Sequence, residues 1–196
     1  MSQLKIFKNA VLMFLVLTIV TGILYPLFIY VFAHLFFPFE ANGSLISVNN
    51  KIIASKIIGQ NFTQDKYLWS RPSETDSYPY NPLSSGSSNF ALTNSKLLDE
   101  IVLNVNKLQT FNKEDKIPID IVTPSASGLD PEISLEGAYY QIYRIAKVRK
   151  ISLEKVKKII DKNVVDSYFS LFVKPRVNVL MVNLNLDGIQ YKRVLR

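Results

Sequence analysis

Near its start the chain has a long hydrophobic run, with no charged residue between Lys8 and Glu40. Of the residues from 10 to 37, 18 are Val, Leu, Ile or Phe. At roughly −0.3 to −0.6 kcal/mol for each side chain, they favour membrane insertion by about 5–11 kcal/mol. As a helix this stretch would be about 42 Å long, compared with roughly 30 Å for the hydrocarbon core of a bilayer. The pattern predicts a transmembrane anchor helix over residues 10–37.

The flanks of this run indicate that it is retained and how it is oriented. A cleaved signal peptide has a shorter apolar core and ends at small residues, whereas this run ends in Phe36-Phe37-Pro38-Phe39-Glu40. Lys5 and Lys8 precede the run, and positive residues favour the cytoplasmic side. We therefore expect residues 1–9 in the cytoplasm and residues 40–196, the outer part, on the other side. This describes a single-pass protein of the cell membrane.

Within the outer part, apolar side chains recur at three- and four-residue spacing in three segments. This period is typical of amphipathic helices. A residue able to cap a helix stands before each segment: Asn94 or Ser95, then Ser134, then Ser152. We expect the second helix to continue to about Lys150.

Other segments show strand-like patterns. Short apolar runs on both sides of Asn49-Asn50 predict a hairpin, because Asn tolerates the positive φ of a tight turn. Residues 119–122 resemble a short strand. Residues 177–186 are the strongest strand candidate, with a change of register typical of a β-bulge. Helices and strands without regular alternation predict one mixed α+β domain after the anchor.

Residues 71–94 show neither period and are rich in Pro, Ser, Asn and Gly. A loop of this length in a compact domain is usually functional or disordered. Trp69, Tyr78 and Tyr80 argue against disorder, since disordered segments are poor in aromatic residues. We interpret these residues as an ordered binding loop.

Several kinds of chemistry are excluded. The only histidine, His34, lies in the apolar run, and the chain has no cysteine. The outer part therefore cannot hold a Ser-His-Asp triad or a histidine-ligated metal, and we expect it to hold no metal and no cofactor. Ser152 and Lys155 have the Ser-x-x-Lys spacing of some hydrolases. A helix cap explains Ser152 without catalysis, and an anchored surface enzyme is the alternative.

Charge limits the kinds of partner. Of the net charge of +7, Lys5 and Lys8 contribute 2, which leaves +5 for the outer part. This excess favours anionic lipid or an acidic partner surface. Because the chain has no dense block of Lys and Arg interleaved with aromatic residues, we expect no nucleic acid partner.

Polar segments of the outer part are more specific than its periodicity. They are Tyr67–Ser73, Tyr80–Asn89, Val122–Pro131, Tyr140–Ala146 and Pro175–Leu180, followed by Asn183, Leu184 and Asp187. In this order, and with a single anchor before them, they resemble the C subunit of the Kdp-type potassium-transporting ATPase (the KdpC family). The chain departs from the family at Ser70, where Gly often precedes Arg-Pro, and at Glu132, where His often follows Asp-Pro.

The resemblance implies a non-catalytic accessory subunit of a high-affinity, ATP-driven potassium uptake pump. Such a subunit binds and stabilises the potassium-carrying subunit and the P-type ATPase subunit, which handle K⁺, ATP and Mg²⁺. The family is also described as a catalytic chaperone that raises the ATP affinity of the ATPase subunit, with nucleotide contact suggested for Ser125, Ser127, Gly128 and Gln141. If the outer part lies across the bilayer from cytoplasmic ATP, the effect is indirect. Binding that favours one pump conformation shifts nucleotide affinity by linkage.

Seven positions in the matching segments are expected to touch a partner or shape the loops that do. They are Arg71, Asn81, Gly86, Asp130, Gln141, Arg144 and Arg176. Plainer structural explanations are also open. Asn81-Pro82 and Ser127-Gly128 can simply make turns, Asp130-Pro131 can lead into the helix at Ser134, and Arg144 can be a solvated helix residue. The alternative function is a membrane-anchored extracytoplasmic binding module for a small ligand, which would use residues 71–89.

Overall fold

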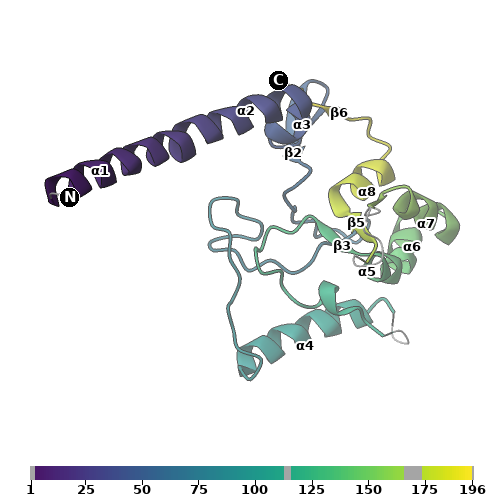
Figure 1. Cartoon of the computed structure of the whole chain (residues 1–196). Coiled ribbons are helices and arrows are strands. Elements are labelled where there is room, and N and C mark those ends of the chain that lie inside the picture. Colours follow the sequence, from purple (N-terminus) through teal and green to yellow (C-terminus); the bar gives the residue numbers. More distant parts are fainter. Residues whose placement is uncertain (1–2, 113–115, 166–173, 196) are drawn as a thin grey trace. The chain divides into compact units, whose positions relative to one another are not determined.

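The structure, a computed structural model, describes residues 3–112, 116–165 and 174–195 (Figure 1). The chain forms two compact units, Met1–Leu45 with Arg193–Arg196, and Ile46–Lys192. The first contains one long apolar helix, and the second mixes helices with short strands. The predicted α+β class with a single N-terminal apolar helix is confirmed.

The first unit contains a continuous helix of 34 residues, Gln3–Phe36. Its parts, with the short helix that follows, are α1 (Gln3–Ile19), a π-helical turn η1 (Val20–Leu24), α2 (Tyr25–Phe36) and α3 (Pro38–Ala41). No side chain from Gln3 to Phe36 is fully buried, and the helix is long and apolar enough to cross a membrane. It begins seven residues before the predicted start at residue 10, since charge does not prevent helix formation and Gln, Leu and Lys favour it.

The hairpin is confirmed. Its strands are β1 (Leu45–Val48) and β2 (Lys51–Ser55). Asn49 and Asn50 have φ angles of 50° and 63°, and two consecutive positive values are the mark of a type I′ turn. A third strand, β6 (Lys192–Arg193), completes a sheet of order β2-β1-β6.

A second, antiparallel sheet has the order β3-β5-β4. Its strands are β3 (Glu132–Ser134), β5 (Arg176–Asn178) and β4 (Val164–Val165). Ile133 and Val164 both pair with the fully buried Val177. The helices of the second unit are α4 (Ser95–Gln109), α5 (Leu135–Tyr140), α6 (Ile142–Arg149), α7 (Leu153–Asp161) and α8 (Val179–Leu186). Of these, α5 and α8 contact β5 directly.

The predicted helix caps are also confirmed. Side-chain oxygens of Asn94, Ser134 and Ser152 each accept a hydrogen bond from a backbone N–H in the first turn of α4, α5 and α7. The helix expected to run from Ser134 to about Lys150 is instead two helices, interrupted at Gln141. Lys150 ends α6 in a left-handed conformation, with φ 56°.

The strand predicted at residues 119–122 is wrong. Residues Ile119–Ile121 form a 3₁₀-helix, η2, after Pro118. The hydroxyl of Thr123 donates to the carbonyl of Ile119 at 2.8 Å, which closes this turn. Four residues, three of them apolar, are too few to distinguish a strand from one helical turn by period alone.

The strand predicted at residues 177–186 is mostly wrong. Strand β5 ends at Asn178, whose Oδ1 accepts the N–H of Met181 at 3.1 Å and so caps α8. Residues Val179 to Leu184 are all buried, so this part of the helix faces the core on every side and its apolar residues show no helical period. The change of register between Val179 and Leu180 marks the start of this helix, not a β-bulge.

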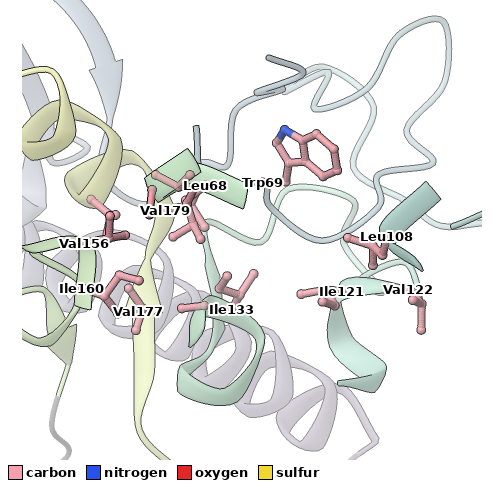
Figure 2. Close-up of a cluster of buried hydrophobic side chains, with 14 residues drawn as sticks. Leu68, Trp69, Leu108, Ile121, Val122, Ile133, Val156, Ile160, Val177 and Val179 are labelled. Atoms are coloured by element: carbon pink, nitrogen blue, oxygen red, sulfur yellow. The ribbon is translucent and has the colours of Figure 1, made fainter. Parts of the chain in front are cut away.

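The hydrophobic core of the second unit joins regular elements to an irregular segment (Figure 2). Val177 of β5 lies beside Val156 and Ile160 of α7, and all three are fully buried. Leu68 and Trp69 belong to no helix or strand, yet they are part of the same buried cluster. The core therefore positions residues 65–69, from which the candidate site is built.

Candidate functional site

Residues 65–69 form neither helix nor strand, and side chains hold their backbone in place. Leu68 N–H donates to Asn183 Oδ1 at 2.8 Å, and Asn183 Nδ2 donates to Leu68 O at 2.9 Å. Trp69 N–H donates to Gln141 Oε1 at 2.8 Å, and Gln141 Nε2 donates to Trp69 O at 3.1 Å. Each amide thus makes the pair of hydrogen bonds that an antiparallel strand residue would make.

Gln141 lies at the break between α5 and α6 and is 2% exposed. Besides its bonds to Trp69, Nε2 donates to Gly137 O at 3.2 Å, and Oε1 accepts from Arg144 Nη2 at 2.6 Å. A primary amide has two N–H donors and two acceptor lone pairs. All four are therefore used within the chain, and contact with a nucleotide would have to replace one of these bonds.

Arg144 is buried beside the same segment. Its Nη1 donates to the carbonyls of Asp65 and Tyr67, the second at 2.9 Å. The guanidinium carbon lies 3.7 Å from the centroid of the Trp69 ring. Burial lowers the pKa of Arg144 to about 10, against the opposing effect of Asp65, so the group is charged at neutral pH. The interpretation of Arg144 as a solvated helix residue is wrong.

Sequence reasoning did not select Arg149, which completes this arrangement. Its Nε donates to Lys66 O, its Nη1 to Leu186 O and its Nη2 to Asp187 Oδ1, at 2.6, 2.8 and 2.6 Å. The hydroxyl of Tyr67 donates to Asp187 Oδ2 at 2.8 Å. Burial disfavours the charged form of Asp187, but the hydrogen bonds from Arg149 and Tyr67 outweigh it and lower the pKa of Asp187. No sequence signal distinguishes Arg149 from the basic residues around it.

Asn183 is one of the residues that carry the resemblance, but it is not among the seven predicted site positions. It is a polar residue within the apolar run of residues 177–186. A buried amide needs hydrogen-bond partners, so this position was a usable signal. Its partner, Leu68, is 115 residues away in the chain, and no local pattern identifies it.

A second group of predicted residues lies where residues 71–94 meet residues 123–130. Arg71 Nη1 pairs with Asp130 Oδ2 at 3.3 Å, and Arg71 Nη2 donates to Pro124 O at 3.1 Å. Gly86 N–H donates to Ser127 O at 2.9 Å. The structure thus brings Arg71, Gly86, Ser127 and Asp130 into one pair of loops, as the order of the segments alone could not show.

Gly128 is required by this pairing for two reasons. Its φ is +67°, which favours glycine. A Cβ at this position would lie 2.5 Å from Thr75 Cγ2 and 2.6 Å from the carbonyl oxygen of Gly86. At Gly86 itself a Cβ would meet nothing within 4 Å. Of the two glycines, Gly128 is the one that permits close approach of the loops.

Asn81 and Ser125 are buried within these loops. Asn81 Nδ2 donates to Asp76 O, and its Oδ1 accepts from Leu83 N–H, both at 3.0 Å. Ser125 N–H donates to Pro72 O at 3.4 Å. The plainer explanation given for Asn81, that it makes a turn, agrees with this geometry.

Arg176 projects from β5, and its side chain is half exposed. Its Nη1 lies 3.3 Å from Glu132 Oε2 on the neighbouring strand β3. Arg71, Asp130, Glu132 and Arg176 together line a cavity of about 230 Å³. Glu132, one of the two positions where the chain departs from the resemblance, therefore has a cationic partner in this chain.

Another cavity of about 230 Å³ lies beside Trp69. Its wall includes Arg71, Tyr80, Asn104 and Lys107, and its lining contains no Asp or Glu. Burial raises the pKa of Tyr80 to about 12, so its hydroxyl is neutral at physiological pH. Within residues 3–112, 116–165 and 174–195, no group of three or more His, Asp or Glu side chains could hold a metal ion.

Comparison with known proteins covers both groups of residues and the long helix. Residues 7–188 match the family model KdpC, described as the c chain of the K⁺-transporting ATPase. The potassium-transporting ATPase KdpC subunit of Polynucleobacter asymbioticus is 46% identical over 186 residues, which are 94% of this chain and 98% of that protein. The proteins of the same name from Yersinia enterocolitica and Bradyrhizobium diazoefficiens are 44% and 43% identical. Those two alignments cover 95% and 94% of this chain, and 94% and 98% of the relatives.

Proposed function

Because this chain belongs to the KdpC family of K⁺-transporting ATPase c chains, we propose that it binds and stabilises the potassium-carrying and P-type ATPase subunits without catalysing a reaction itself. The coarser role follows from the family: the chain is a membrane-associated accessory subunit in potassium uptake, with one candidate spanning helix. The finer statement, that the chain binds these two subunits and catalyses no reaction, is what we propose.

The observation that carries the proposal is the pairing of the two irregular loops. Residues 71–94 and 123–130 are held together by Arg71 and by backbone hydrogen bonds. Within the longer loop, Leu83 and Leu92 are 91% and 88% exposed. Apolar side chains on a preorganised loop suit a binding surface, because little conformational entropy is lost when a partner docks.

Recovery of partner subunits tests this proposal. The tagged full chain is purified from detergent-solubilised membranes, and the other pump subunits recovered with it are measured. We expect Arg71→Ala to lower recovery several-fold, since it removes the contacts to Asp130 and Pro124, and removal of residues 3–36 to lower it further. Lys155→Ala, on the exposed face of α7, is the matched control. Undiminished recovery with both altered chains would remove the proposal.

We also propose that any effect on ATP affinity is indirect. Ser125 is buried, and all hydrogen-bonding positions of Gln141 are used within the chain, so neither of these two residues is free to bind a nucleotide. The apparent ATP affinity of the pump is measured with and without this chain, and a photoreactive ATP analogue tests direct contact. We expect the affinity to change without labelling of this chain. Labelling at residues 125–128 would favour direct contact.

The proposed orientation places residues 1–9 in the cytoplasm and residues 40–196 outside, as the lysines before the helix favour. Protease added to intact cells is then expected to digest the outer part. If digestion occurs only after the cells are opened, the orientation is reversed, and the bilayer no longer separates the outer part from ATP.

The cavity beside Trp69 favours the alternative, a small-ligand binding module. Two cations, Arg71 and Lys107, line this cavity, and no acidic residue does. Trp69 is the only tryptophan, so its fluorescence would report a ligand there. Saturable binding of a small anion by the full chain, with no other pump subunit present, would favour this alternative.

A further inference from the structure

The long helix has a break in its backbone hydrogen bonds at η1. Tyr25 N–H donates to Val20 O, five residues back, where an α-helix would use the carbonyl four residues back, that of Thr21. The next residue, Pro26, has no N–H. The carbonyl of Thr21 would accept from Tyr25 in an α-helix and from residue 26 in a π-helix. Tyr25 donates to Val20 O and Pro26 has no N–H, so neither of these donors reaches it, and Leu24, the donor of a 3₁₀ bond, lies within the π-helical turn.

Nearby side chains do not replace the missing donor. The hydroxyls of Thr18 and Thr21 donate to the carbonyls of Phe14 and Leu17, each at 2.8 Å, on the N-terminal side of the break. The carbonyl of Thr21 therefore lies within the apolar span without a partner of its own. Hydrocarbon offers no water to satisfy it, so an unpaired carbonyl at this depth is strongly disfavoured.

The helix is open beside this carbonyl. Gly22 follows Thr21 directly, and a Cβ at Gly22 would meet nothing within 4 Å. A neighbouring helix can approach its backbone closely at such a position. π-helical turns within helices are frequently found at functional sites.

We propose that the carbonyl of Thr21 accepts a hydrogen bond from a hydroxyl or amide side chain on a transmembrane helix of another subunit of the pump. This rests on the proposed function, because it requires a pump subunit as neighbour. A spanning helix can bring a donor to this depth. In a parallel second copy the nearest threonine hydroxyls are those of Thr18 and Thr21, and both already donate within their own helix. A different chain therefore fits better than a second copy.

Two substitutions test the contact in different ways. Pro26→Ala restores an N–H and allows a regular α-helix, so the carbonyl no longer needs an outside donor. Gly22→Leu leaves that carbonyl unpaired but blocks close approach, and its added hydrophobicity favours insertion. We expect each to lower recovery of the other pump subunits about three- to fifteenfold, the range set by single interhelical hydrogen bonds. Leu12→Ala and Ala10→Leu make matched changes elsewhere in the helix and are expected to leave recovery unchanged.

Alkaline extraction of the membranes shows whether each variant is inserted, and a photoreactive residue identifies the neighbour. We expect a photoreactive residue at position 18, one turn from Gly22, to crosslink to another pump subunit. Wild-type recovery with both Pro26→Ala and Gly22→Leu would overturn the inference and leave the proposed function intact. Crosslinking to a second copy would also overturn it. If the wild-type chain recovers no other subunit, the proposed function and this inference both fail.

Discussion

The long helix and residues 65–69 satisfy their backbone hydrogen bonds in opposite ways. Away from the break at η1 the bonds of the helix are local, so its side chains are free to be apolar, and none is fully buried. Apart from the bond of Tyr67 N–H to Gln64 O at 3.1 Å, residues 65–69 depend on distant side chains, those of Gln141, Arg144, Arg149 and Asn183. Those polar side chains must therefore be inside the domain. In the second unit, a polar residue in a segment that carries the family resemblance can thus stabilise the fold, whether or not it also contacts a partner.

The largest expected effect comes from removing the buried cation. Arg144→Leu would leave the carbonyls of Asp65 and Tyr67 without a donor, and we expect it to lower the free energy of unfolding by about 3–5 kcal/mol. Urea unfolding of the full chain in detergent, followed by Trp69 fluorescence, measures this. Lys155→Ala is the control and should stay within about 0.5 kcal/mol of the wild type. A small loss for Arg144→Leu would contradict the role given to this side chain.

The comparison is most direct when one side-chain hydrogen bond is removed in each region. Asn183→Leu leaves the buried N–H and C=O of Leu68 unpaired, and we expect it to cost about 2–4 kcal/mol of unfolding free energy. Thr18→Val removes a hydrogen bond to a carbonyl that lies within regular α-helix, and we expect it to change stability by less than about 0.5 kcal/mol. The same unfolding measurement serves for Asn183→Leu, and alkaline extraction serves for Thr18→Val. Equal tolerance of both changes would mean that residues 65–69 do not depend on Asn183.

The pair of loops contains two glycines, Gly128 and Gly86, and only at Gly128 do the backbone and the neighbouring atoms exclude a larger side chain. Gly128→Ala combines a positive φ with a collision against Gly86 O, and we expect a loss of about 2–3 kcal/mol. Gly86→Ala has open space and no positive φ, and it should cost no more than about 1 kcal/mol. Thermal unfolding of the two variants compares them. If Gly128→Ala is the milder change, the loops do not pack as closely as described.

The smallest expected effect is a pH dependence. The pKa of Asp187 is lowered below its ordinary value of 3.8, because hydrogen bonds from Arg149 and Tyr67 outweigh burial. The carboxylate therefore stabilises the fold above that value, and this stabilisation is lost as the pH falls through the lower pKa of the folded state. We expect Asp187→Asn to make unfolding less sensitive to acid below about pH 4, with Asp99→Asn on the exposed side of α4 as control. Identical pH profiles for Asp187→Asn and the wild type would contradict this.

Local features of the fold were predictable from the sequence. Asn49-Asn50 specified the hairpin, and Ser134 and Ser152 began the helices expected of them. Each of these depends on groups within a few residues of one another. The apolar residues 177–186 could not be assigned in this way, since a buried helix and a buried strand read alike when every side faces the core.

The candidate site was less predictable than the fold. The resemblance selected Gln141 and Arg144, yet what they do depends on Trp69 and Tyr67, 72 and 77 residues earlier in the chain. Arg149 was missed because its partners, Lys66 and Leu186, are also remote, 83 and 37 residues away in the chain. The periodicity of a segment indicates which of its side chains face the core. It does not indicate which distant backbone carbonyls will need a hydrogen-bond donor.

The sequence by itself determined the long apolar helix, the hairpin and the helix caps, because each follows from hydrophobicity or hydrogen bonding between neighbours in the chain. It also identified the family, through five ordered polar segments. Only the tertiary structure decided that residues 179–186 are a helix and that Gln141, Arg144, Arg149 and Asn183 hold an irregular segment. A buried polar group must be paired wherever the fold places it, and only the assembled core determines which groups meet.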